Sequence, residues 1–265
     1  MPEGDSLEHA AQRLQPIVGG VLDAVGGSHR AVAPFRRRLV GMTIAEVSAF
    51  GKHLLIHLDR HWSIRTHLGM SGSWRLYPRN TPWRRTAGKA RLTLTTSAHV
   101  AVCFSAPTVE IGPTPRVLDS IAHLGPDVLH DEIDTVVIIE RARASSALTA
   151  ADLLLDQRVM SGVGNVFKSE ILFLEKIAPS TPVRLLSDDS IASLANRARR
   201  LLRANRKPGP RSTTGRRGRN ADTWVYGRGG RPCRRCAMLI ESEPHGDLDR
   251  VTYWCPRCQT TELTT

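Results

Sequence analysis

The sequence predicts an α+β protein of several domains: a helix, an antiparallel β-sandwich, a helical region and a small zinc-binding hairpin. Between about residues 20 and 112, apolar and polar residues alternate in short β-branched runs bounded by Gly, Pro or Asn, which indicates strands with one buried face. Helical spacing follows, and two Cys-x2-Cys pairs lie near the end of the chain. Runs of strands followed by runs of helices are typical of the α+β class.

The composition favours a folded protein with a sizeable core. The chain has 265 residues, of which 41% are hydrophobic and 23% charged. No run of about 18 apolar residues could span a membrane, and the acidic start lacks the apolar segment of a secretory signal. We therefore expect a cytoplasmic protein without a membrane partner, in which five cysteines do not form a disulfide framework.

The first expected element is a helix, and strands follow it. Leu7, Ala10, Ala11 and Leu14 share one face of a helix that Pro16 ends. Five later runs alternate as strands do: 42–50, 53–59, 61–68, 90–96 and 99–104. These runs indicate an antiparallel domain, which we expect to be a sandwich.

The second half of the chain is expected to be helical after a linker at 124–134. Helices are expected at 147–157, 166–177 and 187–206. The last begins at the N-cap Ser187, with two acids in its first turn and arginines in its last turns, as the helix dipole favours. Residues 207–220 are predicted to form a flexible basic loop.

Positive charge is concentrated in one segment. Residues 197–235 hold fourteen Arg or Lys and one acid, Asp222. This segment therefore carries a net charge of +13, and the rest of the chain sums to −1, which gives the total of +12. Codon bias is the alternative explanation, because Arg outnumbers Lys 32 to 5, but bias does not account for the missing acids. The segment indicates a polyanion partner, and we expect nucleic acid.

The four C-terminal cysteines predict one structural zinc ion. Cys233, Cys236, Cys255 and Cys258 form a Cys-x2-Cys-x18-Cys-x2-Cys pattern, and four thiolates complete a tetrahedral zinc site with no open position. The alternatives are two redox pairs or cysteines without a role. Cys103, within an apolar strand, is expected to be an inert core residue.

A glycine-rich turn, "SGVGNVF", opens onto the helix expected at 166–177. Successive backbone N–H groups near a helix N-terminus, with Asn165 beside them, can hold a phosphate. An ordinary helix start is the alternative. Between a basic helix and a zinc hairpin, the turn is a candidate clamp for a DNA backbone.

Four motifs carry a resemblance to a known family. They are "MPEGD" at the start, "GKHLL" with Lys52, "DQRVMSGVGNVFKSEILF" around Asn165, and "DRVTYWCPRCQ" near the end. In this order and spacing, the chain resembles the formamidopyrimidine-DNA glycosylase and endonuclease VIII family, which repairs oxidised bases. The Glu-Gly-Asp that follows the proline is closer to the endonuclease VIII branch than to the Pro-Glu-Leu-Pro-Glu start of the other branch.

The resemblance implies three domains, with DNA in the cleft between the first two. They are a catalytic β-sandwich at 1–118, a helix–two-turn–helix domain at 119–222 and a zinc-finger β-hairpin at 223–265. It also implies a bifunctional DNA glycosylase and AP lyase that acts on damaged DNA as a monomer at the nucleoid. Its zinc is structural, and no catalytic metal is expected.

The resemblance makes Pro2 the nucleophile. If Met1 is removed, Pro2 has a free secondary amine, which forms an iminium with C1′ of a deoxyribose. An α-amino group with a pKa near ~8 is partly neutral at physiological pH, whereas lysine at ~10.4 is not. Glu3 resembles the family's acid/base residue. From the residues alone, Pro2 is tolerated in a first helical turn and Glu3 complements the helix dipole.

Four further residues take their expected roles from the family. Lys52 matches the essential lysine, although it also fits a solvated strand end. Asn165 and Arg250 match residues that grip the phosphates beside the extruded nucleotide. Met70 in "THLGMSG" matches a side chain wedged into the base stack, although a methionine in a turn is more often a packing residue.

The chain departs from the formamidopyrimidine branch in one loop. That branch has an arginine and an aromatic residue near "FSAPTVEIG", where this sequence offers Thr108, Val109 and Ile111. The 207–220 loop also shows no convincing similarity to the loop that caps oxidised guanine in some relatives. These departures put in doubt the reading of the opposite base by that arginine. The resemblance to the endonuclease VIII branch implies excision of oxidised pyrimidines, followed by strand cleavage through β,δ-elimination. The alternatives are an oxidised-purine glycosylase and a non-catalytic DNA-binding protein with a zinc hairpin.

Overall fold

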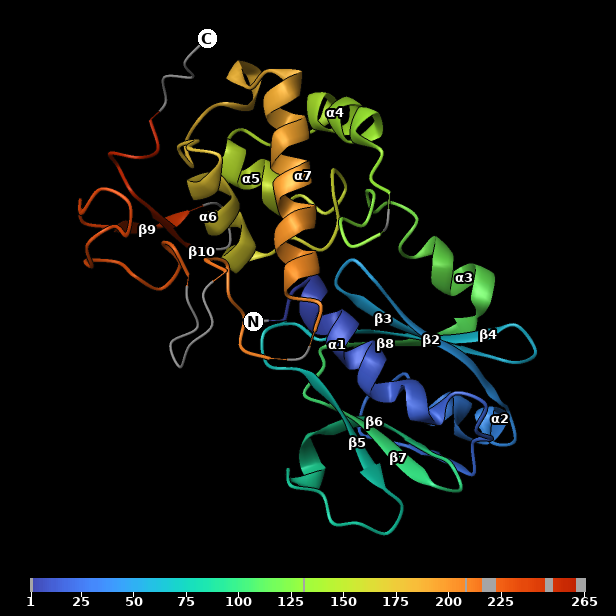
Figure 1. Cartoon of the computed structure of the whole chain (residues 1–265). Coiled ribbons are helices and arrows are strands. Elements are labelled where there is room, and N and C mark those ends of the chain that lie inside the picture. Colours follow the sequence, from blue (N-terminus) through green and yellow to red (C-terminus); the bar gives the residue numbers. More distant parts are fainter. Residues whose placement is uncertain (1, 131, 208, 216–222, 246–249, 261–265) are drawn as a thin grey trace. The chain divides into compact units, whose positions relative to one another are not determined.

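The computed structural model describes residues 2–130, 132–207, 209–215, 223–245 and 250–260. The chain divides into two compact units, Met1–His123 and Leu124–Thr265, and each is described by itself (Figure 1). None of the helices in the described ranges has both the length and the hydrophobicity needed to cross a membrane.

The N-terminal unit begins with the expected helix, α1 (Gly4–Leu14). Its buried face contains Leu7, Ala10, Ala11 and Leu14, as the spacing predicted. Pro16 lies in the short 3-10 helix η1 (Gln15–Ile17) that follows, because proline removes the N–H that another α-helical turn would need.

Two four-stranded antiparallel sheets form the sandwich (Figure 1). One has the order β2-β3-β4-β8, from β2 (Ile44–Phe50), β3 (His53–Leu58), β4 (Trp62–His67) and β8 (Thr108–Pro113). The other has the order β1-β6-β7-β5, from β1 (Ala24–Gly26), β6 (Ala90–Thr95), β7 (His99–Phe104) and β5 (Ser73–Pro78). The apolar faces of both sheets and of α1 enclose one core. The fold class is confirmed.

Three strands were not predicted, and one of them changes an expectation. Thr108, Val109 and Ile111 belong to β8 instead of a loop, and Val109 and Ile111 are buried in the sandwich core. The side chains of Val109 and Ile111 therefore belong to the core and are not available to contact bases. The unit also holds η2 (Ala33–Phe35), α2 (Arg36–Leu39), η3 (Ala87–Lys89) and α3 (Thr114–Asp119).

The C-terminal unit packs four longer helices around a second core. These are α4 (Thr135–Ala144), α5 (Ala150–Leu155), α6 (Asn165–Leu174) and α7 (Asp188–Ala204), with η4 (Val183–Leu185) between the last two. The Ser187 hydroxyl accepts a hydrogen bond from the Ser190 N–H and caps α7 as predicted. All but the last residue of α6 are buried, because α5, α7 and β10 (Arg250–Trp254) surround it.

The end of the unit is a two-stranded hairpin of β9 (Glu241–His245) and β10. Its apolar cluster is small, and it combines Val225 and Ile240 with two of the cysteines and with Phe173 of α6. So few apolar residues cannot fold such a segment alone. The hairpin therefore depends on α6 and on its cysteines.

Candidate nucleic-acid interface and metal site

Pro2 and Glu3 lie at the start of α1. The Glu3 carbonyl accepts hydrogen bonds from the N–H groups of Ser6 at 2.9 Å and Leu7 at 3.2 Å, which fixes the entry of the chain into the helix. Pro2 is half-buried, and Glu3 is fully buried. The Glu3 side chain makes no capping hydrogen bond to α1, so capping does not explain this buried acid. Met1 lies outside the described residues.

Lys52 lies in a two-residue turn between β2 and β3. Phe50 pairs directly with His53, and Gly51 has φ +57°, which a side chain at this position would disfavour. The turn holds the half-buried Lys52 at the end of a rigid sheet. Lys52 is therefore placed by backbone geometry, as a catalytic lysine would need to be.

Two histidines beside Lys52 were not identified from the sequence. His53 and His67 are paired residues of β3 and β4, with ring centroids 5.1 Å apart. Burial, followed by the charge of Arg65, lowers the pKa of His53 to about 3. Burial and the charge of Lys52 lower the pKa of His67. Both rings are therefore neutral at physiological pH and can accept hydrogen bonds.

Met70 lies at the tip of the turn that joins β4 to β5. Its side chain is 81% exposed, more than any other large apolar side chain among the described residues. The Gly72 N–H donates to the Leu68 carbonyl at 2.8 Å, and a Cβ at Gly72 would lie 2.2 Å from that oxygen. The Gly69 N–H donates to Nδ1 of His67 at 3.2 Å. Met70 is thus held outward, and packing does not account for its position.

Asn165 and Arg250 lie together in the C-terminal unit. Asn165 is the first residue of α6, and its Nδ2 donates to the Val251 carbonyl at 2.9 Å. Val251 follows Arg250, the half-buried first residue of β10. Oδ1 of Asn165 is buried and has no hydrogen-bond partner among the described residues. Asn165 therefore joins the start of α6 to the strand that carries Arg250.

Two buried charged residues of α6 were missed from the sequence. Nζ of Lys168 donates to Oγ1 of Thr252 at 2.6 Å, and both side chains are buried. Glu170 is also fully buried, and its carboxylate accepts four hydrogen bonds. The donors are the Thr213 hydroxyl and the N–H groups of Trp224, Val225 and Tyr226.

These two residues tie α6 to both ends of the C-terminal segment. Burial raises the pKa of Glu170, and the hydrogen bonds from Thr213 and the three N–H groups oppose that rise. All four partners act as donors, so the geometry is that of a carboxylate. Residues 208 and 216–222 of the predicted basic loop lie outside the described residues. Ser212 donates through its N–H to Oδ1 of Asn205 at 2.8 Å, so this part of the loop is anchored.

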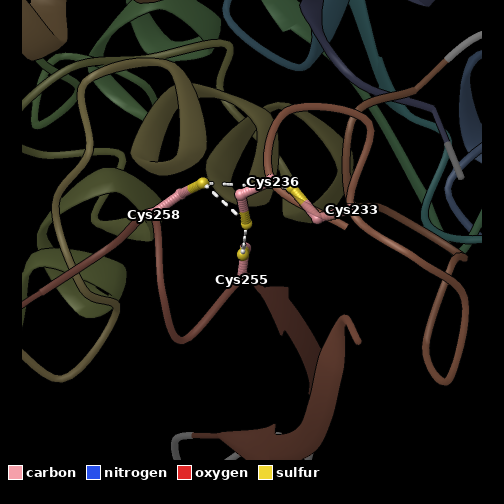
Figure 2. A group of neighbouring side chains, drawn as sticks. All are labelled: Cys233, Cys236, Cys255 and Cys258. Carbon is pink, nitrogen blue, oxygen red and sulfur yellow. Dashed lines mark hydrogen bonds between the residues drawn. The ribbon is translucent and has the colours of Figure 1, made fainter. Parts of the chain in front are cut away.

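The four cysteines lie together and fit a zinc ion (Figure 2). Their sulfur atoms all lie within 4.8 Å of one another, and three pairs are separated by 3.3, 3.4 and 4.0 Å. Tetrahedral zinc with Zn–S bonds of about 2.3 Å would place the sulfurs about 3.8 Å apart. The donor set and its spacing therefore suit a closed structural site.

Backbone groups shape both Cys-x2-Cys turns. The Met238 N–H lowers the pKa of Cys236 to about 7, which favours the thiolate that a metal needs. The Cys255 N–H donates to Oε1 of Gln259, and Nε2 of Gln259 donates to the Ile177 carbonyl, both at 2.9 Å. By contrast, burial raises the pKa of Cys103, as expected for an inert core thiol.

Comparisons with known proteins give a consistent result. The N-terminal domain model of formamidopyrimidine-DNA glycosylase matches residues 1–107, and its H2TH domain model matches residues 124–214. The chain is 38% identical to "Probable endonuclease 8 2" of Streptomyces coelicolor, over 98% of this chain and 94% of that protein. It is 37% identical to "DNA-(apurinic or apyrimidinic site) lyase Nei2" of Mycolicibacterium smegmatis, over 98% and 99% of the two chains.

A solved structure agrees with the sequence relatives. The fold matches Lactococcus lactis Fpg (MutM), in complex with DNA that contains an oxidised pyrimidine, with a TM-score of 0.84 and 25% identity. The match covers 98% of this chain and all of that one. With the buried acid beside Pro2 and the four-cysteine hairpin, these matches show that the chain belongs to the formamidopyrimidine-DNA glycosylase and endonuclease VIII family.

Proposed function

We propose that this DNA glycosylase and AP lyase excises oxidised pyrimidines through a Schiff base at Pro2 and then cuts the strand by β,δ-elimination. Family membership carries the general activity. The observation that carries the mechanism is the half-buried Pro2 followed by a fully buried Glu3, at a helix start that backbone hydrogen bonds hold fixed. A buried acid next to an N-terminal secondary amine suits acid/base catalysis.

In this mechanism the N-terminal unit performs the chemistry. The Pro2 nitrogen bonds to C1′ as the bond from C1′ to the damaged base breaks. Glu3 protonates the sugar ring oxygen, the ring opens and an iminium forms. Loss of a C2′ proton then expels the 3′ phosphate, and loss of a C4′ proton expels the 5′ phosphate. Lys52 contacts the phosphate beside the lesion, and water hydrolyses the iminium to release Pro2.

The C-terminal unit holds the DNA backbone in this proposal. Asn165 and Arg250 bind phosphates. The N-terminus of α6 suits a phosphate, and the hydrogen bond from Asn165 holds the start of β10, with Arg250, next to it. Zinc on the four cysteines would cross-link the hairpin and contribute no step of the reaction. Met70 would occupy the space left by the extruded base. The protein would act as a monomer on damaged chromosomal DNA.

Two observations favour pyrimidine lesions. The start "MPEGD" resembles the endonuclease VIII branch. The region that carries an arginine and an aromatic residue in the other branch is strand β8 here, with Val109 and Ile111 buried. No side chain of β8 therefore replaces that pair. A panel of duplexes with oxidised pyrimidines or oxidised purines separates the two preferences, because faster excision of purines would overturn the pyrimidine assignment.

Borohydride trapping tests the nucleophile directly. Reduction of a mixture with abasic DNA should give a covalent complex, and mass spectrometry of the digested complex should place the DNA on the N-terminal peptide beginning with Pro2. A form that retains Met1 has no secondary amine and should not be trapped. Trapping of that form at full yield, or attachment of the DNA to one of the five lysines, would remove Pro2 from the mechanism.

A further inference from the structure

One stretch of the N-terminal unit contains no acidic residue. Between Asp59 and Glu110 the sequence has fifty residues, of which eight are Arg or Lys. Among the described residues, two of the eight form ion pairs, Arg65 with Glu110 and Arg79 with Asp23. Five of the other six lie on strands β5 and β6 and on their connection, so positive charge without an ion-pair partner in the described part of the chain gathers there.

That connection, residues 79–89, is held by aromatic packing and is called the Trp83 loop here. Trp83 stacks on Tyr77 with ring centroids 6.3 Å apart, and it meets Phe104 edge-on at 6.0 Å. These rings belong to an apolar cluster separate from the sandwich core. The aromatic side chain therefore fixes the loop to the sheet.

Three cations of the loop are exposed at one end of the sheet: Arg84, Arg85 and Lys89. Arg85 donates to Oγ of Ser73 at 3.1 Å, and its guanidinium lies 5.9 Å from the centre of the Phe104 ring. Ser73 begins β5 directly after the Met70 turn, and it pairs with Phe104. Arg85 therefore lies at the end of the sheet from which Met70 projects.

We infer that the Trp83 loop binds the phosphate backbone of the duplex that flanks the Met70 turn. This inference rests on the proposed function, because it needs duplex DNA at Met70. Exposed guanidinium groups suit phosphate oxygens. Because no carboxylate of the described residues neutralises these groups, each one that binds a phosphate releases condensed counterions from the DNA, which strengthens binding. Such contacts carry no sequence information, so they hold damaged and undamaged duplexes alike.

The test is the salt dependence of DNA binding by Arg84→Gln with Arg85→Gln, which keeps side-chain length and removes both charges. Each lost phosphate contact should reduce the slope of log K against log[salt] by about 0.9, so the double variant should lose about 1.8. The matched control is Arg60→Gln with Arg116→Gln. This pair is also exposed, but it lies where β4 begins and β8 ends, at the opposite end of β4 from the Met70 turn.

The outcomes separate this inference from the proposed function. Wild-type protein that is not trapped on abasic DNA would defeat the proposed function whatever the slopes are. If it is trapped, the loop variant should reach the same trapping yield at saturating protein, with an affinity lower by about tenfold at moderate salt. An unchanged slope, or an equal loss of slope in the control pair, would overturn the inference.

Discussion

The β-sandwich and the C-terminal hairpin carry candidate site residues on two differently built supports. The sandwich surrounds a continuous apolar core to which α1 and both sheets contribute, so Pro2, Lys52 and Met70 rest on buried hydrophobic surface. The hairpin has a small apolar cluster, and Arg250 depends on four cysteines and on buried polar contacts to α6. Removal of a single polar group should therefore unfold the hairpin more readily than the sandwich.

The largest expected effect comes from the metal site. Cys255→Ser removes one of four thiolates, and in small modules the metal-binding energy is much of the folding energy. Zinc content should fall from one to near zero per chain, and affinity for DNA should fall at least tenfold. Trapping at Pro2 should survive on abasic DNA supplied at high concentration, because the sandwich has its own core.

Metal analysis, binding titrations and trapping yields measure these three effects. Cys103→Ala is the control, since this thiol lies in the sandwich core, far in sequence from the zinc ligands. A Cys255→Ser protein with unchanged zinc and DNA affinity would contradict this account. A variant that binds DNA normally but forms no Schiff base would instead indicate a catalytic metal.

A smaller effect is expected from Glu170→Gln. The amide is isosteric with the carboxylate, but its NH2 group would face backbone N–H groups and leave donors without an acceptor. Loss of a buried charged acceptor should lower the unfolding free energy of the C-terminal unit by about 3 kcal/mol. Chemical denaturation with a probe in the C-terminal unit measures this change. Glu140→Gln, on the exposed face of α4, should change it by less than about 0.5 kcal/mol.

The smallest effect concerns pH and the sandwich. The pKa of His53 is lowered from 6.5 to about 3 by burial and then by Arg65, so below pH 6.5 the unfolded chain binds a proton that the folded chain does not. Stability should therefore fall as pH decreases from 6.5 toward 3, and over the first unit, from pH 6.5 to 5.5, the loss should not exceed about 1.4 kcal/mol. His67 acts in the same direction.

Denaturation midpoints across this pH range measure the contribution. His53→Gln keeps a hydrogen-bond acceptor for Arg65 and should give a flatter profile than wild type. His61→Gln, at an exposed position, is the control and should reproduce the wild-type slope. A His53→Gln profile as steep as wild type would show that other groups determine the acid sensitivity.

Elements with a strong local pattern could be predicted from the sequence. Helix α1 was predicted from its apolar face, α7 from its capping serine and arginines, and five strands from their alternation. Helix α4 was not predicted, because Val136, Val137, Ile138 and Ile139 are β-branched and favour strands intrinsically. Strand β1 has three residues, and β8 is stabilised by its pairing with β4, which is distant in sequence.

The same distinction applies to the site. The cysteines were predicted because zinc coordination requires a fixed spacing, and their convergence is confirmed. The buried hydrogen bonds of Lys168 and Glu170 could not be predicted, because their partners, Thr252 and residues 224–226, lie more than fifty positions away in the sequence. His53 and His67 occur as ordinary polar members of alternating strands. Their proximity to Lys52 becomes visible once the register is known.

The burial of α6 has a consequence for synthesis of the protein. The core of the sandwich is complete once residue 111 has been made, so the N-terminal unit can fold while the rest is still being translated. Helix α6 cannot become buried at that stage, because Thr252 covers Lys168 and the Gln259 side chain bonds the chain just after α6. At about 5–20 residues per second, the segment around α6 waits several seconds for these partners. If a ribosome stalls in this interval, the N-terminal unit that carries Pro2 is already folded, while the apolar residues of α6 are still exposed and can be bound by chaperones.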